Sequence, residues 1–306
     1  MKKVVIIIVN YNKYEDTIVC VESLLNIYNI HLANIIIVDN CSTNDSYSIL
    51  KERFIDSKIT ILYADENKGY CAGNNIGIVY AKQNINPDYY WILNPDTIVD
   101  NMAMTALIEF AEDHIEAGII GSRLIYYPDM DRLQALGGGY ITIDKLGIIS
   151  LTQIFNGDSV TKKLPEYIEL ESLVGASLFI KKEVIEIIGL MDESYFMYFD
   201  ESEYCLRAKQ NGWKLYGVST SVIYHKEGWR EQKQKCWSQY YAVRNRLFLI
   251  HRYYPKHLFV NTLFNFYISF RLLCRIMLLR RNSMIMSWYT LKGIIDFFLQ
   301  KKGKVI

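Results

Sequence analysis

The sequence predicts an α/β protein with a mostly parallel central sheet flanked by helices, followed by a C-terminal helical appendage. Strand-like and helix-like segments alternate through the first hundred residues, as a parallel sheet with crossover helices requires. The run VVIIIV at 4–9 is β-branched without alternation, which is typical of a strand buried on both faces. Apolar residues make up 51% of the 306 residues, enough to fill a large core.

The elements of the first half follow in order. Strands are predicted for VVIIIV, NIIIVDN, KITILYA and YYWIL, and helices for EDTIVCVESLLNIY, SYSILKERF and NNIGIVYAKQ. In the first of these helices the apolar residues recur at helical spacing, at Ile18, Val21, Leu24, Leu25 and Tyr28. Another helix is expected to begin near Met102.

The second half is less regular. Residues 123–170 contain the turn signals LGGGY and FNGDS, and we interpret them as hairpins or a flap over a site. The segment GASLFIKKEVIEIIGLMDESYF predicts a strand and a short helix that ends at Gly189. FDESEYCLRAKQNGW predicts a helix from near Asp200 to Gly212, and KLYGVSTSVIYH predicts a last pair of strands.

The composition shifts after Trp229, towards Lys, Arg, Gln and Tyr. On a helical wheel of 258–279, polar residues gather on one side, at His257, Asn261, Asn265, Arg271 and Arg275. Large apolar residues gather on the opposite side, at Phe259, Phe266, Phe270, Leu273 and Met277. Two interpretations stay open: a helix packed on the rest of the protein, or a basic amphipathic helix in a membrane interface. The lysines of QKKGKVI and the arginines at 280–281 favour the second.

Composition argues against several classes of protein. The formal net charge of +1 does not suit bulk binding of nucleic acid. The six cysteines are scattered without CxxC spacing, as expected for reduced thiols in a cytoplasmic protein rather than for disulfides or a zinc site. MKKVVIIIVNYN is expected to be a first strand and not a signal peptide, and no run of eighteen apolar residues predicts a membrane span.

Polar residues follow all four predicted strands of the first half. They are Asn10, Tyr11 and Asn12; Asp39, Asn40 and Ser42; Asn67, Lys68 and Gly69; and Asn94, Pro95 and Asp96. The carboxyl ends of parallel strands share one edge of the sheet, where α/β proteins bind ligands. For Asp96 alone, a simple turn that caps the next helix is the alternative to a role in a site.

The first turn lacks the glycine pattern of a dinucleotide site and the lysine loop of an NTPase. The ring of Tyr11 and its neighbouring amides suit a nucleobase better than a pyrophosphate. Asp39 has two interpretations, a helix cap with Ser42 or an acceptor for the imide N–H of uracil or thymine.

Six motifs in order, VNYN, VDNCS, NKGYCAGNNIG, LNPD, FDESEYCLRAKQNGW and IYHKEG, resemble family 2 glycosyltransferases of the inverting GT-A type. The similarity spans roughly residues 3–250 and is strongest to the rhamnosyltransferase-like branch. It implies a Rossmann-like GT-A fold, a nucleotide-diphosphate-sugar donor, a divalent metal (Mg or Mn), and a saccharide or lipid-linked acceptor.

The resemblance also implies roles for individual residues. It places the donor among Val9, Tyr11, Asn12, Asp39, Asn40, Gly69, Tyr70, Asn74, Asn75 and Asn94. Asp96 matches the last acid of the family's metal motif, while Asn94 and Pro95 stand where many relatives have further acids. His225 matches a late histidine of the family, and it is either a second metal ligand or a structural residue.

For the catalytic base, the family has Glu-Asp where this chain has Asp200-Glu201. Alignment on CLRA puts Glu201 at the base position, with Asp200 in reserve; alternatively both acids only begin a helix. Gly175 and Ala176 match an acceptor-side loop. Trp229 and Arg230 are candidates to close over the donor, and RNR at 244–246 is either a phosphate contact or a surface ion-pair segment.

Together these features predict a catalytic domain over 1–228, with a nucleotide-sugar half up to about residue 100 and an acceptor half after it. Residues 229–306 would form a helical region that either packs on this domain or associates with a membrane. The expected location is cytoplasmic, peripheral at the inner face of the cell membrane. The expected activity is transfer of L-rhamnose from dTDP-rhamnose in bacterial surface polysaccharide synthesis. Open alternatives are a UDP-sugar donor carrying galactofuranose, glucose or N-acetylhexosamine, a sugar-nucleotide nucleotidyltransferase, and a non-catalytic binding subunit.

Overall fold

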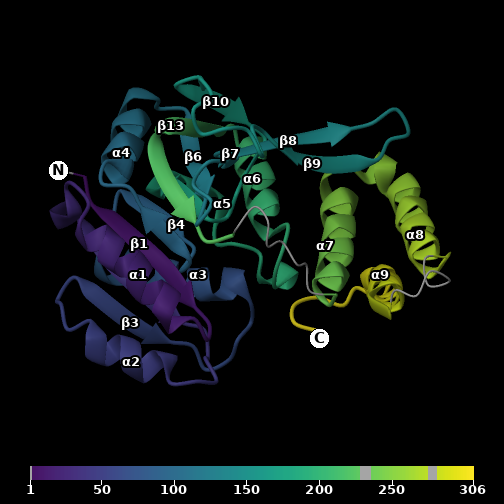
Figure 1. The fold of residues 1–306 in the computed structure, drawn as a ribbon, viewed down its shortest axis with the longest axis horizontal. Helices are drawn as coiled ribbons and strands as arrows, with labels where there is room; N and C mark the ends of the chain where they lie inside the picture. Colours follow the sequence, from purple (N-terminus) through teal and green to yellow (C-terminus); the bar gives the residue numbers. More distant parts are fainter. Residues whose placement is uncertain (1, 228–235, 275–280) are drawn as a thin grey trace.

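The computed structural model of the chain describes residues 2–227, 236–274 and 281–306 (Figure 1). Its main sheet has the strand order β10-β13-β6-β12-β4-β1-β2-β3. Its first four strands along the chain pair in parallel, namely β1 (Val4–Asn10), β2 (Ala33–Asp39), β3 (Ile59–Tyr63) and β4 (Tyr89–Leu93). The predicted α/β fold with a parallel sheet in the first hundred residues is therefore confirmed.

Helices cover both faces of this sheet. They are α1 (Tyr14–Leu25), α2 (Ser46–Arg53), α3 (Tyr70–Asn84), α4 (Ala103–Asp113), α5 (Lys182–Ile188) and α6 (Asp200–Gln210). Ile6 and Ile8 face a core shared with α1 and α4, whereas Val5 and Ile7 face a second core with α3, α5 and α6. Successive residues of a strand point to opposite faces, so a strand between two cores is apolar throughout.

The second half completes the sheet with antiparallel pairs and one parallel pair, that of β13 with β6. Its strands are β5 (Thr97–Val99), β6 (Ala117–Tyr126), β7 (Leu133–Leu136), β10 (Tyr167–Leu170), β12 (Ser177–Lys181) and β13 (Lys214–His225). β12 pairs with β4 and with β6, both antiparallel. A smaller sheet holds β8 (Gly138–Ile143), β9 (Ile149–Gln153) and β11 (Ser172–Leu173). Short 3-10 helices lie at Ile30–Leu32, Glu193–Tyr195 and Pro255–His257.

The prediction of two strands in KLYGVSTSVIYH was wrong, because β13 is a single strand. Its register with β6 shifts between Val218 and Val222, and pairing with the same neighbour resumes on both sides of the shift. A bulge thus absorbs the Ser-Thr-Ser segment that suggested a turn. The far end of β13 then pairs with β5, a short strand after Asp96 that the sequence did not suggest.

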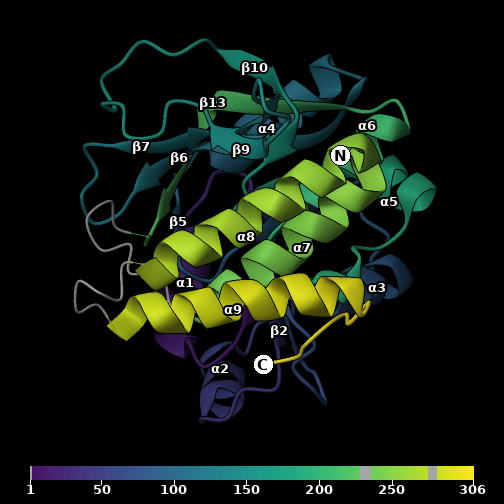
Figure 2. The same ribbon diagram turned by 90° about the vertical axis from the view of Figure 1, so that its right-hand side faces the viewer.

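The C-terminal region contains α7 (Ser238–Tyr253), α8 (Leu258–Cys274) and α9 (Arg281–Phe298), with α9 packed on both other helices (Figure 2). The β8–β9 hairpin reaches across to α8 (Figure 1). There the Asn261 side chain accepts from Ile149 N at 3.0 Å and donates to Gly147 O at 2.9 Å. These contacts fix the helical region to the main body.

The helix α8 buries its polar face and exposes its apolar face. Asn261 is fully buried, and Ser269 bonds to Ser287 of α9 at 2.7 Å. Phe259 and Phe270 are 73% and 64% exposed. Packing of α8 on the rest of the protein therefore explains where its polar side lies. Arg275, Met277 and Arg280 lie outside the described residues, as does the side chain of Arg281. None of the described helices combines the length and apolar character needed to cross a bilayer.

Candidate active site

A cavity of about 660 Å³ lies at the carboxyl ends of β1, β2 and β4. Seven of the predicted site residues line it, namely Val9, Tyr11, Asn40, Gly69, Tyr70, Asn94 and Asp96. The expected convergence of separate strand exits on one hollow is thus present in the structure. Lys13 and Asn67 also line it, as do Trp237, Tyr289, Lys304 and Ile306 from the C-terminal region, which no sequence motif indicated.

Asp39 and Asn12 lie behind this wall and hold the first two strand exits together. The buried Asp39 carboxylate accepts from Asn10 Nδ2 at 2.7 Å and from Ser42 N at 2.8 Å. Asn12 Oδ1 accepts from Thr43 N at 2.8 Å. These bonds match the capping interpretation of Asp39, and its contact with a nucleobase stays a prediction.

The segment from Gly69 to Asn75 supports a loop that borders the cavity. Tyr70 N donates to Phe196 O at 3.0 Å, and a Cβ on Gly69 would lie 2.2 Å from the same oxygen. Asn75 exchanges two bonds of 3.0 Å with the backbone of Met191. Asn74 is fully buried beside them and donates to Tyr70 O. Asn74 and Asn75 thus organise the wall from behind.

The bordering loop is strained, since Phe196, Tyr198 and Phe199 all have φ near +65°. The RNR segment of α7 holds it in place. Asn245 Nδ2 donates to Tyr195 O and Met197 O, both at 2.7 Å, and Arg244 Nη2 donates to Tyr195 O at 3.1 Å. Both side chains are fully buried. The ion-pair interpretation of RNR required surface residues and is therefore wrong for Arg244 and Asn245. These two side chains instead hold the loop through its carbonyl groups.

The pairing of β5 with β13 brings Asp96 and His225 together, because His225 lies opposite Thr97. His225 Nε2 lies 3.2 Å from Asp96 Oδ1, and Asn94 Nδ2 lies 3.5 Å from the same nitrogen. Burial disfavours the imidazolium, but the adjacent Asp96 carboxylate outweighs it and raises the pKa of His225. Burial likewise opposes ionisation of Asp96, but the hydrogen bond from His225 leaves the pKa of Asp96 below its ordinary value.

Two residues that the sequence did not single out orient His225. Nδ1 lies 3.0 Å from Gln134 Oε1, and Gln134 Nε2 donates to Glu227 Oε2 at 2.7 Å. A proton on Nδ1 is donated to Gln134 Oε1. When Nε2 is deprotonated, its lone pair points towards Asp96. The signal for Glu227 was its place beside the histidine in IYHKEG; Gln134 lay in a region predicted as irregular.

The oxygen and nitrogen donors of Asp96 and His225 suit a divalent metal such as Mg²⁺ or Mn²⁺. Within the described ranges, no group of three or more His, Cys, Asp or Glu side chains forms a closed metal site. The residues fit a metal that takes its remaining ligands from a bound phosphate group and from water.

Glu201 lies at the start of α6, near Tyr70 of the cavity wall. A Cβ on Gly175 would lie 3.7 Å from Glu201 Cβ and 3.9 Å from Tyr70 Cε1, so the three residues are neighbours. Burial and the neighbouring Asp200 carboxylate raise the pKa of Glu201 well above its ordinary value. Asp200 itself is buried and accepts from the Cys71 thiol at 3.3 Å. Of the two acids, Glu201 is the more accessible.

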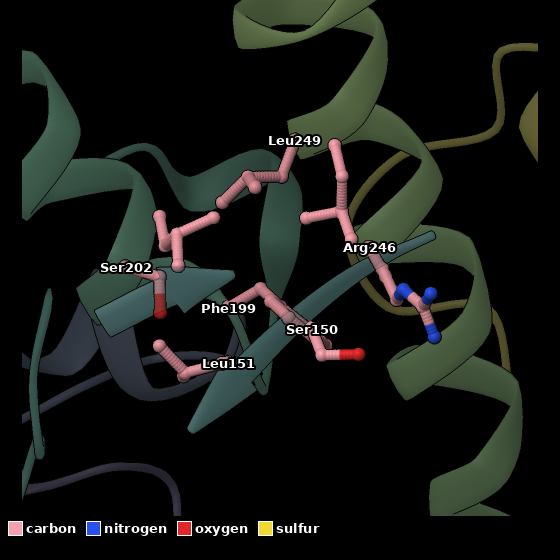
Figure 3. A pocket seen from close by; sticks show the side chains of 8 residues that line it. Ser150, Leu151, Phe199, Ser202, Arg246 and Leu249 are labelled. Atoms are coloured by element: carbon pink, nitrogen blue, oxygen red, sulfur yellow. The ribbon is translucent and has the colours of Figure 1, made fainter. Parts of the chain in front are cut away.

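A second cavity of about 250 Å³ lies between the start of α6, the β8–β9 hairpin and α7 (Figure 3). Leu151 of β9, Phe199 and Ser202 line it together with Leu249 and Arg246 of α7. The Arg246 guanidinium donates to Asn261 Oδ1 at 2.9 Å, so this arginine of RNR is committed to α8. Trp229 and Arg230, the candidates to close over the donor, lie outside the described residues.

Comparison with known proteins identifies the family. Glycosyl transferase family 2 matches residues 5–157. The chain is 26% identical over 207 residues to the low-salt glycan biosynthesis hexosyltransferase Agl10 of Haloferax volcanii, covering 67% of this chain and 61% of Agl10. It is 24% identical over 233 residues to the dTDP-rhamnosyl transferase RfbF of Shigella flexneri, covering 71% of each.

Among solved structures, the fold is similar to GalNAc-T7 with UDP, GalNAc and Mn²⁺. The TM-score is 0.65 at 14% identity, and the match covers 98% of this chain and 58% of GalNAc-T7. The arrangement of a parallel sheet with antiparallel additions and flanking helices is the GT-A fold. The chain spans about three fifths of the length of Agl10. It belongs to glycosyl transferase family 2 and has the GT-A fold.

Proposed function

We propose that this protein is an inverting glycosyltransferase that moves L-rhamnose from dTDP-rhamnose to a saccharide or lipid-linked saccharide acceptor in bacterial surface polysaccharide synthesis. The observation that carries the proposal is the cavity itself, which collects Tyr11, Asp96 and Tyr70, with Glu201 adjacent. Its volume of about 660 Å³ is in the range expected for a site of this kind. Similarity to RfbF supports the choice of sugar.

In this proposal the nucleobase of the donor lies near Tyr11 and Val9, and the diphosphate of the donor lies near Asp96. Asp96 and His225 would hold a Mg²⁺ or Mn²⁺ ion, which neutralises charge on the departing diphosphate when bound. Asn94, which lines the cavity beside Asp96, would lie within reach of the diphosphate. The catalytic domain would span 1–228, with the donor half before about residue 100 and the acceptor half after it.

Glu201 is the proposed general base. In an inverting transfer, a carboxylate removes the proton of the acceptor hydroxyl as its oxygen attacks the anomeric carbon opposite the diphosphate. A raised pKa for Glu201 supports this role, since a base works best when its pKa approaches the working pH. Gly175 leaves room for the acceptor beside it.

Calorimetric titration with dTDP-rhamnose and with UDP-sugars, in Mg²⁺ or Mn²⁺ and after EDTA, tests the donor and the metal together. We expect the tightest binding for dTDP-rhamnose, and loss of turnover in EDTA that added metal restores. Asp96→Ala should abolish transfer, whereas Asp113→Asn, an exposed acid on α4, should leave it unchanged. Tight binding of a UDP-sugar with no response to dTDP-rhamnose would overturn the rhamnose assignment.

Glu201→Gln tests the base separately. Because the side chain keeps its shape, donor affinity should be retained while kcat falls by about 100-fold or more. Near-normal turnover would remove Glu201 from the mechanism. Release of sugar from the donor in the absence of acceptor would exclude a non-catalytic subunit, and pyrophosphate-dependent nucleotide exchange would instead support a nucleotidyltransferase.

The exposed apolar face of the C-terminal helices supports binding to the inner face of the cell membrane. It consists of Phe259, Leu263, Phe266, Tyr267 and Phe270 on α8, of Met284, Trp288 and Ile295 on α9, and of Leu299 directly after α9. Arg271 stands beside Tyr267 and would meet anionic lipid. Aromatic residues on one side of a helix suit a lipid interface. Residues 229–306 would thus form the membrane-associating region.

Sedimentation with phosphatidylglycerol vesicles tests this surface. The double variant Phe270→Ala/Trp288→Ala should lose about tenfold in vesicle affinity, because each change removes a large apolar side chain that lipid would bury. Ile115→Ala changes an 81% exposed residue outside the C-terminal helices and should have no effect. Equal sedimentation of all three proteins would contradict the proposed membrane contact.

A further inference from the structure

The segment 303–306 follows α9 and returns to the donor cavity. Figure 1 shows this part of the chain, in yellow, passing beneath the lower end of α7. Lys304 and Ile306 line the cavity alongside Asp96 and Tyr11. The chain thus carries a cation from its C-terminal region to a site built mainly from the first hundred residues.

Hydrogen bonds fix the segment on both sides of Lys304. Gly303 N donates to Ser194 O at 2.7 Å, and Gly303 O accepts from Arg244 Nη1 at 2.8 Å. On the other side, the Tyr241 hydroxyl accepts from Val305 N and Ile306 N, both at 3.2 Å. Arg244 also binds the loop that borders the cavity, so the segment and the loop share one anchor.

The charges in the cavity leave a role for Lys304. Lys13, the other lysine of the lining, has Asp16 at 3.7 Å. In the ranges that the structure describes, no carboxylate lies within 4.0 Å of Lys304, whereas Lys301 pairs with Asp296 at 2.9 Å. Asp96 is the one carboxylate side chain in the described lining. A diphosphate in such a site is incompletely neutralised by one acid-bound metal, and a lysine ammonium is a suitable additional partner.

We infer that Lys304 binds the diphosphate of the donor, and that the bonds of Tyr241 and Arg244 to the 303–306 segment position it for this contact. The inference rests on the proposed use of a nucleotide-diphosphate-sugar. It assigns a donor ligand to a part of the chain that no motif covers, and it makes the helical region a component of the donor site. The ligand class is a nucleoside diphosphate, free or sugar-linked.

The test compares the wild type with Lys304→Ala by calorimetry. One series of probes is thymidine, dTMP and dTDP, and the second is uridine, UMP and UDP. Lys304→Ala should weaken binding of the diphosphate by about five- to tenfold, the range for a charge-assisted contact at a partly open site. The bare nucleoside should bind both proteins equally. Lys304→Arg should restore most of the loss.

Lys302→Ala removes a neighbouring exposed lysine that does not line the cavity and should bind the diphosphate like the wild type. Tyr241→Phe removes the hydroxyl that holds the segment and should reproduce part of the loss. In a Lys304→Ala background it should add little, because both changes break the same contact. A circular dichroism melt of Tyr241→Phe shows whether the protein is folded.

Two results would overturn the inference. One is equal diphosphate affinity for Lys304→Ala and the wild type; the other is the same loss for nucleoside and diphosphate, which would indicate a general distortion of the site. If the wild type binds neither diphosphate, the proposed function fails and this inference fails with it. Normal diphosphate binding that depends on Asp96 but not on Lys304 would refute the inference alone.

Discussion

Asn245 should be among the residues on which both stability and the donor site depend most. Its amide group has two N–H donors, and both make short bonds of 2.7 Å, to Tyr195 O and Met197 O. Loss of the bond to Tyr195 O should cost about 1 kcal/mol, because that oxygen keeps its bond from Arg244, and leaving Met197 O without a partner should cost about 1–3 kcal/mol. Asn245→Ala should therefore lower the free energy of unfolding by about 2–4 kcal/mol.

The loop that Asn245 holds has three residues in the left-handed region, each of which costs energy when nothing else fixes it. Releasing it should also displace Phe196 and Met197 from the cavity wall, so donor affinity should fall with stability. Urea denaturation followed by fluorescence measures the first effect, and calorimetry with the nucleoside diphosphate measures the second.

Asn84→Ala is the matched control, since Asn84 is exposed at the end of α3 and its amide donates to Tyr80 O. That variant should stay within about 0.5 kcal/mol of the wild type. If Asn245→Ala is equally mild, the bonds from Arg244 and from Tyr70 N suffice to hold the loop, and the reasoning about Asn245 is refuted.

Two further predictions concern the backbone and pH. Gly69→Ala should lower the free energy of unfolding by more than about 2 kcal/mol and abolish donor binding, because the new Cβ would meet the Phe196 backbone at 2.2 Å. Gly189→Ala is the control, since Gly189 has φ +76° and nothing within 4 Å, and it should cost only about 1 kcal/mol in urea denaturation. Equal costs for the two variants would contradict the predicted collision. Asp296 is buried, but the bonds from Lys292, Lys301 and Tyr240 outweigh that burial and lower its pKa below the ordinary 3.8. A lowered carboxyl pKa stabilises the folded state at pH values above 3.8, and this contribution is lost as the pH falls through the lowered value. Asp296→Asn should therefore cost about 2 kcal/mol at pH 6 and much less at pH 3, as urea midpoints at both pH values would show; a constant difference would disprove the linkage.

The strand exits could be predicted from the sequence, because alternating strands and helices leave little choice for where the polar residues after each strand must lie. Tyr11, Asn40, Gly69 and Asp96 reached the cavity for that reason. The contact between Asp96 and His225 could not be deduced from spacing alone. It depends on the register of β5 with β13, which joins residues 129 positions apart.

The orientation of α8 also lay beyond the sequence. A helical wheel separates the asparagines from the phenylalanines but does not say which side faces inward. That choice is made by partners elsewhere in the chain, such as Ile149 N and Gly147 O, which bind Asn261. Likewise RNR indicated a surface or ligand role because arginines are usually exposed, whereas the loop at 194–198 offers Arg244 and Asn245 several carbonyls.

The wall of the cavity that comes from Trp237, Tyr289 and Lys304 is carried by the same helical bundle whose outer side exposes Phe270 and Trp288. A surface that binds the outer side of these helices would therefore shift or fix the cavity wall without contacting the cavity itself. Turnover numbers should consequently depend on the medium: detergent micelles, free solution and a supported lipid film would each set a different catalytic rate for one and the same polypeptide.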